Sequence, residues 1–165
     1  MRPSPKLRVF LDSNVILSGL HSSAGAPGII LERFIEGELM VVISQQVLEE
    51  VVRTINEKLP GALPTLKRLL VSIIPEIVKD PSPQEVTPWA EIIHPDDAGI
   101  LTAAVAAQPD YLITGDKHFF ENPSIAGKSG LHIVTPAQFL ECLKSTELPN
   151  RSVPARGGEK GASLD

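Results

Sequence analysis

The sequence predicts an α/β fold of three layers, in which helices cover both faces of a central parallel sheet. Two observations predict it. Short apolar runs without polar alternation, which are typical of strands buried on both faces, recur at 9–11, 39–44, 111–114 and 132–135. Segments with apolar residues at helical spacing separate these runs, and such alternation is usually closed by right-handed crossovers into a parallel sheet.

The chain length and composition predict one domain. The 165 residues, 42% of them apolar, suffice for a single core, which we expect within residues 1–145. Two prolines and a serine precede the first strand, so residues 1–6 are expected to form a short disordered lead. Residues 146–165 are rich in Gly, Pro, Ser and charge, and a disordered C-terminal tail is expected there.

The sequence also predicts the location of the protein in the cell and the kind of side chain that could bind a metal. No apolar run reaches the ~20 residues of a membrane-spanning helix, and the start MRPSPKL lacks the apolar centre of a secretory signal. A cytoplasmic protein without membrane contact is therefore expected. Cys142 is the only cysteine, so any metal should be held by oxygen or imidazole groups rather than by several thiolates.

The elements of the first half follow from local signals. The strand that ends at Leu11 is followed by an apolar helical run over 15–20, with Ser13 and Asn14 available as caps. Pro27 opens a second helix that Gly37 ends. After the strand at 39–44, a helical stripe at 47, 48, 51 and 55 ends before Pro60, and another helix is predicted at 66–74.

The second half contains one segment whose structure the sequence leaves open. Residues 75–88 are rich in proline, and positions 77–78 can be a short strand or an extended crossing. Asp96 or Asp97 can then cap a helix that carries apolar residues through 105. A strand over 110–116, a strand over 132–135 and a helix opened by Pro136 complete the chain.

Acidic residues from separate segments are predicted to meet at one edge of the sheet. Asp12 and Asp116 each follow a buried strand, and ligand sites of open α/β sheets lie outside the carboxyl ends of their strands. Asp97 begins the helix that leads into the strand before Asp116. Glu50 borders the apolar stripe of its helix more closely than Glu49 does, so Glu50 is the fourth candidate.

Such a cluster predicts a divalent cation. Carboxylates held close together repel one another, and one of them would have to keep its proton near neutral pH unless a cation offset the repulsion. Oxygen ligands without thiolates suit Mg²⁺ or Mn²⁺, which leave positions for water and phosphate. An aspartate at a strand-to-helix turn is also a common helix cap, so Asp12 alone predicts nothing more than a cap.

From about residue 7 to 143 the chain resembles the PIN domain family, whose members have a PIN-like, Rossmann-like fold. Within this family it is most similar to VapC-like toxins of prokaryotic toxin-antitoxin pairs. The segments that carry the resemblance are LDSNVILSGL, SQQVLEEVVRTI, PDDAGILTAAVAA and YLITGDKHF. The resemblance implies metal-dependent cleavage of RNA phosphodiesters. It also implies that Asp12, Glu50, Asp97 and Asp116 match the catalytic, metal-binding acids of the family.

The resemblance assigns supporting roles as well. Asn14 and Thr114 match polar positions that orient the metal-bound network, and Asp96 is expected to be a cap or an auxiliary acid. Related proteins often carry an acid two residues before the acidic pair, where this chain has His94. Three further side chains are candidate contacts to the substrate: Lys117, His118 and Arg53.

Each of those candidate contacts has a structural alternative. A histidine in a turn, such as His118, is more often a solvent-exposed residue than a functional one. Arg53 can instead pair with Glu50 or Glu57 on its own helix.

The resemblance implies three partners: an RNA substrate, an antitoxin protein and a second copy of the chain in a homodimer. The net charge of −5 argues against a broad basic surface, although bound cations can reverse the local charge that RNA meets. Two other functions stay open: an aspartate-based phosphotransfer enzyme with Asp12 as nucleophile, and an inactive scaffold that binds RNA or protein. Asn14 weakens the first, because such enzymes usually place a second Asp there as general acid.

Overall fold

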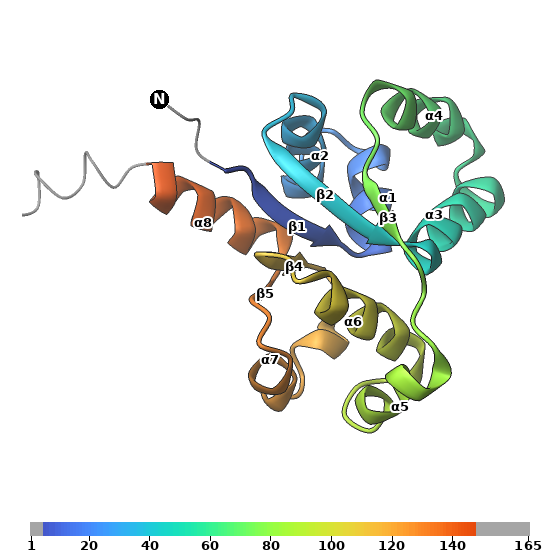
Figure 1. Ribbon diagram of the computed structural model, residues 1–165. Helices are drawn as coiled ribbons and strands as arrows, with labels where there is room; N and C mark the ends of the chain where they lie inside the picture. Colours follow the sequence, from blue (N-terminus) through green and yellow to red (C-terminus); the bar gives the residue numbers. More distant parts are fainter. Residues whose placement is uncertain (1–4, 148–165) are drawn as a thin grey trace, which may run out of the picture.

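A sheet of five parallel strands, in the order β3-β2-β1-β4-β5, forms the centre of the molecule (Figure 1). The computed structural model describes residues 5–147. The predicted three-layer α/β/α fold is therefore confirmed. The strands are β1 (Leu7–Leu11), β2 (Leu39–Ser44), β3 (Glu76–Val78), β4 (Tyr111–Ile113) and β5 (Ile133–Val134).

Helices lie on both sides of this sheet. In Figure 1, α1 to α4 lie on one side and α5 to α7 on the other, while α8 runs beside β4 and β5 and also contacts α2. In the described part of the chain, no helix combines the length and the apolar character that crossing a membrane requires. The helices are α1 (Ser13–His21), α2 (Ala26–Ile35), α3 (Gln45–Lys58), α4 (Leu63–Ser72), α5 (Pro83–Ala90), α6 (Pro95–Ala107), α7 (Ser124–Ser129) and α8 (Pro136–Glu147), with short 3-10 turns η1 (Pro60–Ala62) and η2 (Lys117–Phe119).

The segment that the sequence left open contains both a strand and a helix. β3 pairs in parallel with β2, with Val42 opposite Glu76, so the short strand is the correct alternative. α5 follows, and its N-terminus forms a capping box: the Ser82 hydroxyl accepts from the backbone of Glu85, whose carboxylate accepts from the backbone of Ser82. Pro83 suits the first helical turn, where no intrahelical donor is needed, whereas Pro88 lies inside this short helix.

Several predicted boundaries differ from the structure. The strands expected over 110–116 and 132–135 are shorter, since β4 is Tyr111–Ile113 and β5 is Ile133–Val134. The helix expected over 66–74 is Leu63–Ser72, which begins earlier because Pro64 fits the first helical turn. At the C-terminus, α8 continues to Glu147, and the remainder of the predicted tail, 148–165, lies outside the described residues, as do residues 1–4 of the predicted lead.

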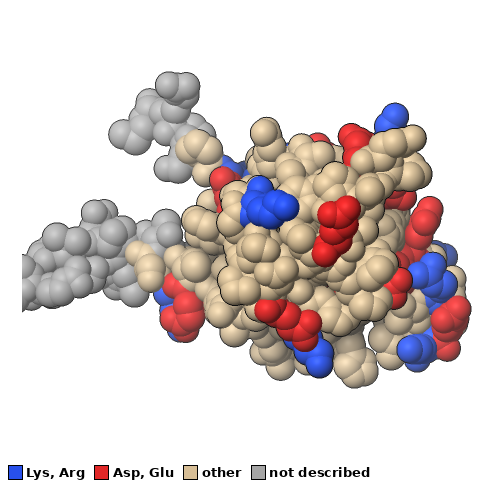
Figure 2. Space-filling model, turned by 90° about the horizontal axis from the view of Figure 1, so that it is seen from below, with Lys and Arg blue, Asp and Glu red and all other residues tan. Residues whose placement is uncertain are grey.

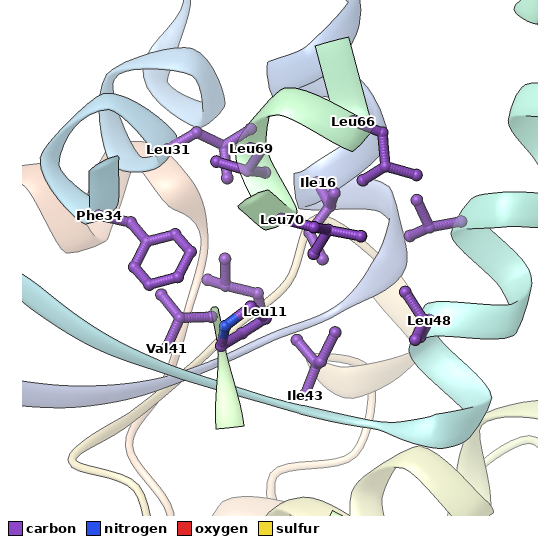
Figure 3. Close-up of a pocket in the computed structure, with 12 residues that line it drawn as sticks. Leu11, Ile16, Leu31, Phe34, Val41, Ile43, Leu48, Leu66, Leu69 and Leu70 are labelled. Atoms are coloured by element: carbon purple, nitrogen blue, oxygen red, sulfur yellow. The ribbon is translucent and has the colours of Figure 1, made fainter. Parts of the chain in front are cut away.

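The core lies between the sheet and the helices on each side. Between the sheet and α1 to α4 it encloses a cavity of about 20 Å³, lined by apolar side chains such as Leu11, Leu31 and Leu66 (Figure 3). A cavity of this size could hold one water, but its walls expose no polar surface to bond it, so we expect it to stay dry. It is a packing defect rather than a ligand site.

Gly28 allows α2 to pack against the chain that connects it to α1. A Cβ at this position would lie 2.6 Å from the backbone oxygen of Ser22 and 2.6 Å from the Cα atom of Ser23. Backbone atoms cannot rotate away, so we expect Gly28→Ala to lower the free energy of unfolding by about 1–3 kcal/mol. Thermal or urea unfolding measures it. Gly127→Ala, in α7 with open space around it, serves as the control and should be neutral or stabilising.

Candidate active site

The candidate site lies where the strand order reverses. β2 and β3 follow β1 on one side, whereas β4 and β5 lie on its other side, so the chain switches direction between β1 and β4. In α/β sheets, ligands bind outside the carboxyl ends of the strands at this point. Asp12 follows β1, the segment 114–116 follows β4, and the backbone N–H of Asp12 donates to the carbonyl of Ile113 over 3.1 Å.

Asp12 is the most buried acidic residue of the site, with 3% of its surface exposed. Its Oδ1 accepts from the backbone N–H of Ser13 at 2.7 Å, and its Oδ2 accepts from the Thr114 hydroxyl at 2.7 Å and from Asn14 Nδ2 at 3.1 Å. Both carboxylate oxygens are thus oriented by neighbouring donors. Asp12 is also the N-cap of α1, as the structural alternative for this residue predicted, so the expectation that Ser13 or Asn14 caps the helix is wrong.

The reason for that error is that Ser13 and Asn14 point elsewhere. Asn14 Oδ1 accepts from the backbone N–H of Gly115 at 2.9 Å, which ties α1 to the turn after β4. Thr114, fully buried, accepts from the backbone N–H of Asp116 at 3.0 Å while its hydroxyl donates to Asp12. The two residues expected to support the site, Asn14 and Thr114, therefore connect Asp12 to the segment that carries Asp116.

Glu50 reaches the same edge from α3. Its Oε1 accepts from the Ser13 hydroxyl at 2.9 Å, and its Oε2 accepts from Gln46 Nε2 at 3.2 Å. Ser13 and Gln46 were not among the predicted residues of the site. Gln46 lies four residues before Glu50, a spacing at which helix side chains are neighbours, so its signal was present in the sequence. Ser13 had no such local signal.

Asp97 and Asp116 meet around His118. His118 Nδ1 lies 2.7 Å from Asp97 Oδ2 and 3.4 Å from Asp116 Oδ1, and the backbone N–H of His118 donates to Asp116 Oδ1 at 2.9 Å. The side chains are 13% exposed for Asp97 and 27% for Asp116. His118, which is more often solvent-exposed in such a turn, is instead bonded to an acid of the candidate site.

The expected cap of α6 is also wrong. His94 is the N-cap, and its Nδ1 accepts from the backbone N–H of Asp96 at 3.2 Å. Pro95 occupies the first helical position, which shifts the cap to the residue before it. Asp96 points outward with its side chain 89% exposed, whereas Asp97 turns toward Asp116.

Arg53 and Lys117 are exposed, and within residues 5–147 neither forms an ion pair or a side-chain hydrogen bond. The alternative that Arg53 pairs with Glu50 or Glu57 is therefore not observed there. On the face that Figure 2 shows, Lys and Arg side chains are scattered rather than gathered into one basic band. Any attraction of this face for RNA has to come from individual cations or from bound metal.

Burial and neighbouring charges shift the pKa values of groups in this site. Burial is the largest cause that raises the pKa of Asp12 from 3.8 to about 6, the charges of Glu50 and Asp97 act in the same direction, and hydrogen bonds from Thr114 and Ser13 partly oppose them. Burial also raises the pKa of Asp97, with a contribution from Asp116. The hydrogen bond to Asp97 raises the pKa of His118.

These groups have the chemistry that a hard divalent cation requires. Asp12, Glu50, Asp97 and Asp116 would offer oxygen ligands, which Mg²⁺ and Mn²⁺ prefer. Among the described residues, the three whose ligand atoms lie within 4.8 Å of one another are His94, Asp97 and His118, so the four carboxylates are not gathered at ligand distance. The raised pKa of Asp12 means that its negative charge is poorly compensated by the protein, and a cation would provide that compensation. Other described residues orient these acids by hydrogen bonds, as is usual around metal ligands: Ser13, Asn14, Gln46 and Thr114.

Comparisons with known proteins identify the family. The family profile of the PIN domain matches residues 8–118. Among solved structures, the chain is similar to VapBC2 from Rickettsia felis, bound to a DNA fragment from its promoter. That match has a TM-score of 0.56 and 18% identity, and covers 78% of this chain and 98% of the other. PAE2754 from Pyrobaculum aerophilum matches with a TM-score of 0.56 and 18% identity over 84% of this chain and 90% of the other.

At 18% identity the two structures establish the fold, and the comparison with curated proteins finds no significant match. The family profile, in contrast, covers well over half of the chain and includes all four candidate acids. This chain therefore belongs to the PIN domain family, whose members are generally nucleases that use a divalent metal.

Proposed function

We propose that the chain is a metal-dependent endoribonuclease and that it is the toxin of a toxin-antitoxin pair. The single observation that carries the proposal is Asp12, an almost completely buried acid at the switch point of the sheet. Its pKa is raised by burial and, in smaller part, by the charges of Glu50 and Asp97, which come from separate segments. A buried acid with so little compensation for its charge is expected where a divalent cation binds.

In this proposal the acids hold the metal and the surrounding side chains hold the acids. When bound, Mg²⁺ or Mn²⁺ lowers the pKa of water and stabilises negative charge on a phosphate. Asp12, Glu50, Asp97 and Asp116 would be its ligands. Thr114 and Asn14 keep Asp12 in place, Ser13 and Gln46 orient Glu50, and no protein side chain is needed as nucleophile.

The contacts of Asp12 favour this function over phosphotransfer. Asn14, which such enzymes would replace by a general acid, donates to Asp12 and accepts from Gly115. The cleavage assay described below distinguishes the nuclease from an inactive scaffold.

Similarity to VapBC2, a complex solved on promoter DNA, supports the toxin part of the proposal. We therefore propose a small protein partner that blocks the acidic edge, and a homodimer as the state of the free chain. Exposed Lys117 and Arg53 are proposed as contacts to the RNA backbone, for which salt-dependent binding is expected.

The experiment pairs two neighbouring glutamates of α3. The purified chain is incubated with labelled single-stranded RNA and Mn²⁺ or Mg²⁺, with and without EDTA. We expect cleavage that EDTA abolishes and that leaves 5′-phosphate ends. Glu50→Gln should lower the rate by at least about 100-fold, because Glu50 faces the other acids and is held by Ser13 and Gln46.

Glu49→Gln is the matched control, since Glu49 is exposed on the same helix and its charge change is identical. Its rate should stay within about 2-fold of the wild-type rate. Cleavage that survives EDTA, or equal losses in both variants, would contradict the proposed function. Binding of RNA without cleavage under any metal would favour the scaffold.

A further inference from the structure

Beside the acidic site lies a hollow with a different set of donors. Its volume is about 360 Å³, and its walls include His94, His118, Glu91 and Glu121. None of the described residues that line it is a lysine or an arginine. The negative charge of Glu121 acts on His118, so the hollow favours a cation.

The two imidazoles in this hollow are paired. The rings of His94 and His118 stack with their centroids 4.8 Å apart and their planes 4° from parallel. Each ring uses Nδ1 in a hydrogen bond: that of His94 accepts from the Asp96 backbone, and that of His118 contacts Asp97. The Nε2 atom of each ring has no hydrogen-bond partner among residues 5–147. Two imidazoles therefore lie side by side at this hollow, and Nδ1 of His118 faces the Asp97 carboxylate.

From this arrangement we propose that His94, His118 and Asp97 form a second metal site, selective for a borderline transition metal such as Zn²⁺. Ligand atoms of the three residues lie within 4.8 Å of one another. Imidazole and carboxylate ligands suit zinc, whereas an all-oxygen set suits Mg²⁺ and Mn²⁺. Glu121 lines the same hollow and adds negative charge beside it.

Binding requires two local movements. Ligand atoms around a tetrahedral zinc lie about 3.3 Å apart, since each Zn–N bond is about 2.0–2.1 Å long. His94 therefore has to leave the stack and turn toward Asp97, and its side chain, which is 48% exposed, has room to do so. His118 Nδ1 is 2.7 Å from Asp97 Oδ2, so zinc has to replace the hydrogen between them and the two atoms have to separate by about 0.6 Å.

The site has a consequence for the acidic centre because Asp97 belongs to both. A zinc ion bound here would draw Asp97 away from Asp116, so Zn²⁺ should compete with Mn²⁺. This consequence rests on the proposed function, but the binding of zinc by the two histidines does not.

The test measures zinc binding directly on the full metal-free chain. Zn²⁺ is titrated in competition with a chromogenic chelator, and Co²⁺ is titrated separately because its visible absorption reports the ligands. His94→Asn retains an oxygen that can cap α6, and His118→Asn retains a donor to Asp97, yet each removes an imidazole. We expect each variant to bind Zn²⁺ at least about 10-fold more weakly and to change the Co²⁺ spectrum.

The other two of the four histidines are matched controls. His21→Asn and His132→Asn should leave the Zn²⁺ affinity within about 2-fold, and Asp12→Asn, which keeps both imidazoles and Asp97, should also retain zinc while losing Mn²⁺. Thermal unfolding of each metal-free variant checks its fold, with His94→Gln and His118→Gln as replacements for a variant that does not fold.

Two results would overturn the second site: a wild-type chain that binds no Zn²⁺, or a Zn²⁺ affinity that is unchanged when both imidazoles are removed. A chain that binds Zn²⁺ through them but cleaves no RNA refutes only the proposed nuclease.

Discussion

Asp12→Asn is expected to lower metal-dependent cleavage of RNA by at least about 1,000-fold, which corresponds to about 4 kcal/mol of lost transition-state stabilisation. The substitution removes the charge of the central acid and places an NH₂ group among donors. Asn14 Nδ2 already points at this position, at 3.1 Å, so the new amide cannot satisfy all its neighbours. Single-turnover cleavage at saturating enzyme, with Mn²⁺ varied, measures the loss and separates it from weaker metal binding.

The control for this variant is Asp110→Asn, at the opposite edge of the sheet. Asp110 Oδ2 accepts from the backbone N–H of Arg8 at 2.8 Å, and an amide oxygen can still do so. The charge change is the same, but we expect the cleavage rate to stay within about 2-fold. If Asp12→Asn retains more than about one tenth of the wild-type rate, Asp12 is not a ligand on which cleavage depends.

Without metal, the wild-type chain should become less stable as pH rises from about 4 to about 6. The pKa of Asp12 is about 6 in the folded chain, against an ordinary value of 3.8, because the carboxylate is buried near Glu50 and Asp97. In this window the folded state binds more protons at Asp12 than the unfolded state does, so the free energy of unfolding falls with rising pH. Two pKa units correspond to about 3 kcal/mol, an upper value for this one group.

The measurement is urea unfolding at several pH values in EDTA, with the Asp12→Asn variant alongside. The variant has no carboxyl group to titrate at this position, so the difference in free energy of unfolding between the two proteins should change by up to about 3 kcal/mol across the window. Adding Mn²⁺ at about 100 times its dissociation constant should add about 2.7 kcal/mol to the wild type near pH 7. If the free energies of unfolding of the two proteins changed in parallel with pH, the pKa of Asp12 would not be raised in the folded chain.

The sequence predicted the layers of this protein well because buried strands have a local pattern. The runs at 9–11 and 39–44 are apolar on both faces, and such runs fit few structures other than strands covered by helices on both sides. The same reasoning placed Asp12 and Asp116 at one edge, since the carboxyl ends of parallel strands lie together. Glu50 followed from helical periodicity, and the structure places it within bonding distance of Ser13.

Patterns within one segment do not report which side chains meet across segments. The bond between Thr114 and Asp12 joins residues 102 positions apart, and the bond between His118 and Asp97 spans 21 positions. Each depends on backbone placements within about an ångström, which hydrophobic spacing does not encode. The caps at Asp12 and His94 were misassigned for the same reason: several polar residues in each turn were able to cap, and contacts with other elements selected one.

Local sequence thus accounts for which segments form buried strands and for the edge of the sheet at which the acids lie. The raised pKa of Asp12, the stacked pair of His94 and His118 and the orientation of Glu50 by Ser13 arise only after the elements have packed. The physical reason is sequence separation. Burial patterns depend on neighbours along the chain, whereas electrostatic and hydrogen-bond partners come from distant segments that only the fold brings together.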